Sequence, residues 1–172
     1  MLLNILLFTV LLICVITDIR SRKIYNKIIF PSLILAFSLH VVHSGWAGLT
    51  ESLLGFATGL GILLIPYLLG GMGAGDVKLL ALIGAIKGAP FIFATAIYMG
   101  IIGGVIAISI LLFRKGVFER LKNIFYFIFS LFNGLKIPLA IDKEGYKTTF
   151  PYGVAIAGGA VVNFFVNGAV FP

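Results

Sequence analysis

Charged residues are scarce in this sequence. They make up 11% of its 172 residues, and hydrophobic residues make up 60%. A soluble globular domain carries about 25% charged residues, so this chain has too few to cover a water-exposed surface. The composition therefore predicts a chain that is solvated mainly by lipid. No internal repeat or low-complexity stretch divides the sequence, so we expect residues 1–172 to form a single membrane-embedded domain.

Cysteine and histidine are also rare. The single cysteine, Cys14, excludes an internal disulfide and a zinc site built from several cysteines. Cys14 lies in an apolar run, which favours a role as a small core side chain. His40 and His43 are three residues apart, but no third ligand is near them, so an interfacial position is favoured over a metal site. The sequence thus predicts neither a metal nor a cofactor.

Long apolar runs make up most of the chain. One membrane crossing needs about 20 residues at a rise of about 1.5 Å each. Runs suited to one crossing each are residues 1–17, 28–42, 52–69 and 152–171. A further run, 77–113, is long enough for two crossings, and Gly88 and Pro90 mark the break between them. We therefore predict an all-α integral membrane bundle of about six transmembrane helices.

The first apolar run resembles a secretory signal peptide only in part. It has no basic region before the apolar residues and no A-x-A-like end. The basic residues Arg20, Arg22 and Lys23 follow the run instead. We therefore expect a retained first crossing.

The basic residues predict the orientation. If the N-terminus lies outside, every Lys and Arg except Lys87 falls on the cytoplasmic side, a strong positive-inside bias. Segment 114–150 includes an aromatic stretch, 123–135, that is short for a crossing and suits a helix along the cytoplasmic interface. A crossing there would move the lysines that follow it outside. The bias also explains the net charge of +7, so we expect no nucleic-acid partner.

Acidic residues number only six. Asp18 ends the first apolar run, and Asp76 begins the fourth crossing after a glycine-rich turn, 70–75. In the predicted topology both lie at the cytoplasmic edge of the bilayer, where an ionisable group is costly unless it is paired. The other acids are expected to be solvated loop charges: Glu51, Glu119, Asp142 and Glu144. Asp18 and Asp76 are therefore the candidates for a functional site.

Two carboxylates held close together cannot both ionise readily, so the pair can hold one shared proton. An aspartyl hydrolase needs this state, because the ionised partner takes a proton from water while the protonated partner donates to the carbonyl oxygen. The sequence does not assign these roles between Asp18 and Asp76. A helix N-terminal role for Asp76 and a surface ion pair for Asp18 remain open as simpler interpretations.

Neighbouring residues fit such a site. Gly73 and Gly75 are expected to permit positive φ and to let an extended substrate backbone approach the acids. Lys78 follows Asp76 by two residues and is expected to point away from it.

The residues around both acids resemble a known family. Residues 71–79, Gly-Met-Gly-Ala-Gly-Asp-Val-Lys-Leu, resemble the GxGD signature of the type IV prepilin peptidases, which are aspartyl proteases of the cytoplasmic membrane. Residues 18–26 resemble the first motif of that family, with Tyr25 where proline is usual. Residues 151–159 resemble its third motif, and the resemblance extends over essentially the whole chain.

The resemblance implies a role for each motif residue. Asp18 and Asp76 would be the catalytic pair of a membrane endopeptidase that needs no metal. Further residues would shape the site or bind the substrate: Gly73, Gly75, Lys78, Pro151, Tyr152 and Gly153. The substrate would be a prepilin-like precursor of type IV pilus assembly or protein secretion. Its short basic leader would be cut at the cytoplasmic face of the inner membrane, just before the hydrophobic helix.

The same resemblance favours the compact, peptidase-only branch of the family, as found with tight-adherence pili. The sequence lacks the paired Cys-x-x-Cys motifs of the larger, bifunctional members, so N-methylation of the product is not expected. Within 114–150, residues 124–132 would form either a lid over the site or an interfacial anchor. Glu119, Asp142 and Glu144 are available to meet a basic leader.

Glycines and asparagines within the crossings are expected to serve helix packing. Three glycine pairs have the spacing that allows close helix approach: Gly55 and Gly59, Gly84 and Gly88, Gly100 and Gly104. Asn163 and Asn167 share one face of the last crossing and are expected to form inter-helix hydrogen bonds.

Two other functions compete with the prepilin peptidase. One is a different GxGD protease of the presenilin or signal-peptide-peptidase kind, but Thr17 stands where tyrosine precedes the first Asp in those proteins, and a Pro-Ala-Leu motif is missing. The other is a small proton-coupled transporter with two relay acids, which predicts internal repeats and acids near the midplane. The sequence favours neither.

Overall fold

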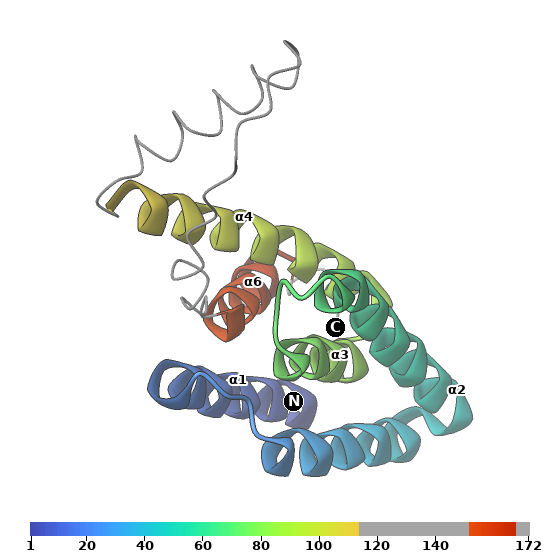
Figure 1. Cartoon of the computed structure of the whole chain (residues 1–172). Coiled ribbons are helices and arrows are strands. Elements are labelled where there is room, and N and C mark those ends of the chain that lie inside the picture. The colour runs from blue at the N-terminus through green and yellow to red at the C-terminus, as the bar shows by residue number, and fades with distance from the viewer. Residues whose placement is uncertain (114–151, 168–172) are drawn as a thin grey trace. The chain divides into compact units, whose positions relative to one another are not determined.

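The computed structural model describes residues 1–113 and 152–167. The helices in these residues are α1 (Leu2–Ser21), α2 (Asn26–Leu68), α3 (Ala74–Lys87), α4 (Ala89–Phe113) and α6 (Tyr152–Asn167), shown in Figure 1. No strand occurs in the described residues, which confirms the all-α prediction for that part of the chain. Met1–Gly103 and Phe150–Pro172 form one compact unit, which holds all the contacts discussed below. A second unit comprises Gly104–Thr149, into which α4 continues.

Among the described residues, three helices are long and apolar enough to cross a membrane: α1, α2 and the Ala89–Ile110 part of α4. α2 has 43 residues, which at about 1.5 Å each is roughly twice the thickness of a hydrocarbon core of about 30 Å. Gly45 interrupts it with φ 59° and ψ −140°, and Figure 1 shows the two halves of α2 running in different directions from a bend. The predicted crossings 28–42 and 52–69 therefore lie in separate halves of α2.

The remaining predicted crossings are shorter as helices. α3 has 14 residues and α6 has 16, both below the usual length for spanning a bilayer. The described residues thus agree with a helical membrane protein, and the count of six crossings stays a prediction. The predicted interfacial stretch 123–135, the lid or anchor at 124–132 and the end of the last crossing, 168–171, lie outside the described residues.

Two predicted helix boundaries can be compared with the structure. The break at Gly88 is confirmed, because Gly88 has φ 83° and separates α3 from α4, with Pro90 in the first turn of α4. The first predicted crossing, residues 1–17, ends before α1 does. α1 continues to Ser21, and Arg22 ends it in a left-handed conformation, its N–H donating to the Asp18 carbonyl oxygen at 2.8 Å. An apolar run marks the extent of the membrane segment, whereas backbone hydrogen bonding continues through polar residues.

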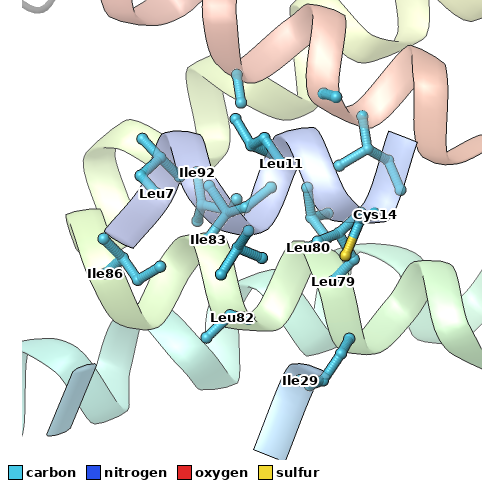
Figure 2. Close-up of a cluster of buried hydrophobic side chains, with 14 of the residues drawn as sticks. Leu7, Leu11, Cys14, Ile29, Leu79, Leu80, Leu82, Ile83, Ile86 and Ile92 are labelled. Carbon is cyan, nitrogen blue, oxygen red and sulfur yellow. The ribbon is translucent and has the colours of Figure 1, made fainter. Parts of the chain in front are cut away.

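α3 lies at the centre of the unit. It contacts α1, α2 and α6, and nearly all of its side chains are buried. Figure 2 shows Leu7, Leu11 and Cys14 of α1 close to Leu80 and Ile83 of α3. The large exposed apolar side chains of this unit belong to the surrounding helices, as a lipid environment requires. The burial of Cys14 confirms its predicted place in the core.

Glycines let α2 and α3 approach closely. A Cβ on Gly55 would overlap the Gly84 carbonyl group, and one on Gly59 would lie 2.6 Å from the Leu80 carbonyl oxygen. This confirms the predicted packing role of Gly55, Gly59 and Gly84. For Gly100 and Gly104 of α4 that prediction is not met in the described residues, because the structure places no atom within 4 Å of either Cβ position.

Polar side chains from both halves of α2 meet the last turn of α3. Ser52 Oγ donates to the Ala85 carbonyl oxygen at 2.5 Å, and His40 Nε2 lies 3.2 Å from the Ile86 carbonyl oxygen. The last carbonyl groups of a helix have no partner within the helix, and these two side chains supply partners for them at the end of α3. His40 thus contacts α3, whereas His43 is exposed. No group of possible metal ligands occurs in the described residues.

Asn163 joins α6 to α4. Its Nδ2 donates to the Phe91 carbonyl oxygen at 2.9 Å and lies 3.0 Å from Thr95 Oγ1. Both Asn163 and Thr95 are fully buried. Asn167 Nδ2 donates to Asn163 Oδ1 at 2.7 Å within the same helix. The expected inter-helix bonds are confirmed for Asn163, and Asn167 supports them from one turn away.

Candidate active site

The two candidate acids are both buried and lie on different helices. Asp18, in the last turn of α1, is 5% exposed, and Asp76, in the first turn of α3, is 9% exposed. α1 and α3 contact each other, and the charge of Asp18 acts on Asp76. Two buried carboxylates whose charges interact are costly unless one holds a proton. The two acids that the sequence singled out thus lie on helices that are in contact.

Asp76 is held by the start of its own helix. The Gly73 N–H donates to Asp76 Oδ2 at 3.1 Å, and the Asp76 N–H donates to the Gly73 carbonyl oxygen at the same distance. This reciprocal pair fixes the carboxylate at the third helical position, where a negative charge is favoured by the helix dipole. The simpler interpretation of Asp76 as a residue that stabilises a helix start therefore holds alongside any catalytic role.

Asp76 directly precedes the apolar stretch that starts at Val77. Its helix, α3, is shorter than the three helices that could cross a membrane. Burial raises the pKa of Asp76 from 3.8 to about 6, the Gly73 hydrogen bond opposes this rise, and the charge of Asp18 adds to it. A carboxyl with this pKa holds a proton for an appreciable fraction of the time near neutral pH. It is therefore suited to proton transfer.

Asp18 is held by a different part of the chain, the first turn of α6. A Cβ built on Gly153 would lie 2.7 Å from Asp18 Oδ2 and 3.0 Å from its Cγ, so the carboxyl group fills the space beside the glycine. The backbone N–H groups of Gly153 and Val154 are positioned to hydrogen-bond to the same carboxylate. Oδ2 itself is buried and has no hydrogen-bond partner in the part of the chain that the structure describes. A buried carboxylate oxygen without a partner is uncommon in folded proteins.

Gly73 and Gly75 do not use the conformational freedom that the sequence suggested. Gly73 has φ −82°, and among the described glycines the positive φ values belong to Gly45, Gly70 and Gly88. The expectation of positive φ at Gly73 and Gly75 is therefore wrong, because α3 already begins at Ala74 and fixes a helical backbone there.

Gly75 makes room for the connection between α1 and α2. A Cβ on Gly75 would lie 3.0 Å from Ile24 Cβ and 3.5 Å from the Ile24 backbone N and O. Lys78 points away from Asp76, as expected, and its Nζ donates to Asn26 Oδ1 at 3.0 Å and lies 5.7 Å from the centroid of the Phe30 ring. Gly75 and Lys78 thus join the segment after Asp18 to the helix that carries Asp76.

The remaining motif residues are only partly described. Tyr152 opens α6 and is half-buried, whereas Pro151 lies outside the described residues, as do Glu119, Asp142 and Glu144. Ile24 and Val154 take part in the site although the sequence gave no reason to select them. Their contacts are made through the backbone or through generic apolar packing, which leave no signal in residue type.

These features define a helical membrane protein in which three separate segments of the chain meet around two buried carboxylates. The chain belongs to the type IV leader peptidase family, whose family model matches residues 5–108, more than half of the chain. The match includes both aspartates and the glycine-rich turn and confirms the family that these residues resemble, whereas the third motif, 151–159, lies outside it. The family makes the chain a peptidase and implies prepilin-like substrates. Neither the curated proteins nor the solved structures include a match to this chain.

Proposed function

We propose that the chain is an aspartic endopeptidase that removes the short basic leader from prepilin-like precursors at the cytoplasmic face of the inner membrane. Asp18 and Asp76 are the catalytic pair. The observation that supports the proposal is the burial of two electrostatically coupled carboxylates on contacting helices in a member of a leader peptidase family. The chain is dominated by apolar residues and has few other acids, so this pair is the natural centre for hydrolysis.

The proposed chemistry needs one proton shared between the two acids. The ionised carboxylate takes a proton from water, and the water oxygen bonds to the carbonyl carbon of the leader junction, while the protonated partner donates to the carbonyl oxygen. The carbon–nitrogen bond then breaks as the leaving nitrogen receives a proton from the pair. The unpartnered Oδ2 of Asp18 and the raised pKa of Asp76 support this shared-proton arrangement.

The substrate fits the surroundings of the pair. A prepilin-like precursor carries its own apolar helix, which can approach from lipid, and exposed apolar side chains lie near Asp18 on α1, namely Ile16 and Ile19. The basic residues that follow α1 favour a cytoplasmic position for this end of the helix, where a leader would be presented. The scissile bond would then lie at the membrane edge, next to the two acids.

Co-expression with a prepilin-like precursor tests the proposal. We expect Asp18→Asn and Asp76→Asn each to lower the cleavage rate by about 10²- to 10⁴-fold, the usual contribution of a general acid or base. The shift of the precursor to its shorter form, followed on an immunoblot, measures the effect. Glu51→Gln is the matched control, because it converts an exposed carboxylate to an amide and should cleave like the native chain. Full cleavage by either Asp variant at native expression would rule out the catalytic pair.

A further inference from the structure

Gly153 faces Asp18 Oδ2, a buried carboxylate oxygen that has no hydrogen-bond partner in the described residues. The position that a Gly153 Cβ would take is 2.7 Å from Asp18 Oδ2, 3.0 Å from Asp18 Cγ and 3.1 Å from Asp18 Cβ. Contacts below 3.0 Å between a Cβ and a heavy atom are essentially never seen, so a side chain here and the present Asp18 conformation exclude each other. The absence of a side chain at 153 is therefore a condition for the observed position of Asp18.

α6 cannot move away to relieve such an overlap. Further along the helix, a Cβ on Gly159 would lie 2.6 Å from the Met99 backbone N and 2.8 Å from the Thr95 carbonyl oxygen, so the α6 and α4 backbones are in direct contact. Asn163 adds two buried hydrogen bonds between the same helices. A short side chain such as that of aspartate turns about its own χ angles at less cost than two packed helices separate. A larger residue at 153 would therefore displace Asp18.

The first turn of α6 also orients the carboxylate. The N–H groups of Gly153 and Val154 lie at the positive end of a helix and act on Asp18, which favours a fixed position for the charged group. Asp76 has no such dependence, because its hydrogen bond comes from Gly73 in the turn before its own helix. Asp18 thus depends for its position on a segment that lies far from it in the sequence.

We propose that Gly153 is a positioning residue for catalysis: the first turn of α6 is a seat that holds the Asp18 carboxylate in place. This inference rests on the proposed function of the pair. Gly153 acts through Asp18 and does not itself touch the substrate. The distinction matters, because a residue that contacts the substrate changes binding, whereas a seat for the acid changes the chemical step.

Steady-state kinetics of Gly153→Ala on a purified prepilin-like precursor that the native chain cleaves tests the seat. We expect kcat to fall by about 100-fold, the loss typical of misplacing a catalytic group by about 1 Å, with KM within about twofold of the native value. Alanine is a better helix former than glycine, so loss of helix cannot account for the fall.

Gly158→Ala is the matched control on the same helix. Its added methyl group meets the flexible end of Ile102, whose Cδ1 is 3.2 Å away, and we expect it to retain nearly native kcat. Native kcat and KM in Gly153→Ala would overturn the seat. A raised KM with native kcat would also overturn it and assign Gly153 to substrate contact. If both Asp→Asn variants are inactive in either case, the proposed function survives and only the seat fails. Activity in those Asp variants would instead overturn the proposed function.

A stability measurement tests the seat without any substrate. The methyl group added by Gly153→Ala would meet the carboxyl group of Asp18. Asp18→Ala removes this carboxyl group and therefore the overlap. We therefore expect Gly153→Ala to lower the Tm of the native chain and to lower it much less in an Asp18→Ala chain. Equal losses of Tm in both backgrounds would show that the methyl group does not meet the carboxylate, and the seat would be excluded even if Gly153→Ala is too unstable for kinetics.

Discussion

At the scale of single residues, the two acids differ in what holds them. The Asp76 carboxylate is bonded to Gly73, three residues away, so its position is set by the local start of α3. The Asp18 carboxylate lies against Gly153, so its position depends on how α6 packs. A pair built this way has one acid whose position is set by local structure and another whose position depends on the packing of a helix distant in the sequence.

Burial of Asp76 has a consequence for stability. Its pKa rises from 3.8 to about 6 in the folded chain. Because the folded-state pKa is the higher one, the protonated carboxyl contributes stability that is fully present below a pH of about 4 and is lost as the pH rises through about 6. Near neutral pH the native chain therefore keeps an ionisable group that opposes folding.

Asp76→Asn should remove this opposition. We expect the Tm of the variant to exceed that of the native chain at pH 8 by a few degrees, since about 2–4 °C corresponds to 1 kcal/mol at this length. The difference should vanish at pH 4. Thermal unfolding in detergent measures it, with Glu51→Gln as a control for the exchange of an exposed carboxylate for an amide. An Asp76→Asn chain that is no more stable than the native chain at pH 8 would contradict the prediction.

At the scale of helices, α2 supplies most of the surroundings of α3. Its first half contacts α3 through Asn26 and His40, and its second half contacts it through Ser52, Gly55 and Gly59. α3 is thereby enclosed between the two halves of one long, bent helix, as Figure 1 shows. Because Asp76 lies in the first turn of α3, the fit between α2 and α3 also fixes one half of the active site.

The closest approach of these helices can be tested with two glycines of α2. Gly55→Ala places a methyl group on the Gly84 backbone, which cannot yield, and we expect a loss of about 1–3 kcal/mol in unfolding free energy or more. Gly61→Ala meets no atom within 4 Å and should be neutral, or stabilising by up to about 1 kcal/mol through helix propensity. Denaturant unfolding in detergent gives both values. Equal stability of the two variants would argue against direct backbone contact between α2 and α3.

At the scale of the whole molecule, the proposed function requires both acids to face the cytoplasm. Lys23 follows α1 on the side of the acids, and Trp46, 82% exposed, lies at the bend of α2. Cysteines at these two positions therefore report the two sides of the membrane. Cys14 is fully buried, so it gives little background labelling.

We expect a membrane-impermeant maleimide to label Trp46→Cys in intact cells and Lys23→Cys only after permeabilisation. The positive-inside distribution of basic residues is the physical reason. Fluorescence of the labelled protein on a gel measures the result, and the native chain is the control for Cys14. Labelling of Lys23→Cys from outside would invert the orientation and place the acids on the wrong side for a cytoplasmic leader.

The class of protein, the helix break at Gly88 and the candidate pair of acids could be predicted from the order of the residues. Apolar runs, charge bias and a GxGD motif are local properties that can be read along one chain, and the family match confirms the family that the motif suggested. The packing of the helices was needed to show that Gly153 is the neighbour of Asp18, that Gly75 makes room for Ile24 and that Lys78 binds Asn26. These contacts join segments far apart in the sequence, and they depend on which helix faces pack together, which no single-chain periodicity specifies.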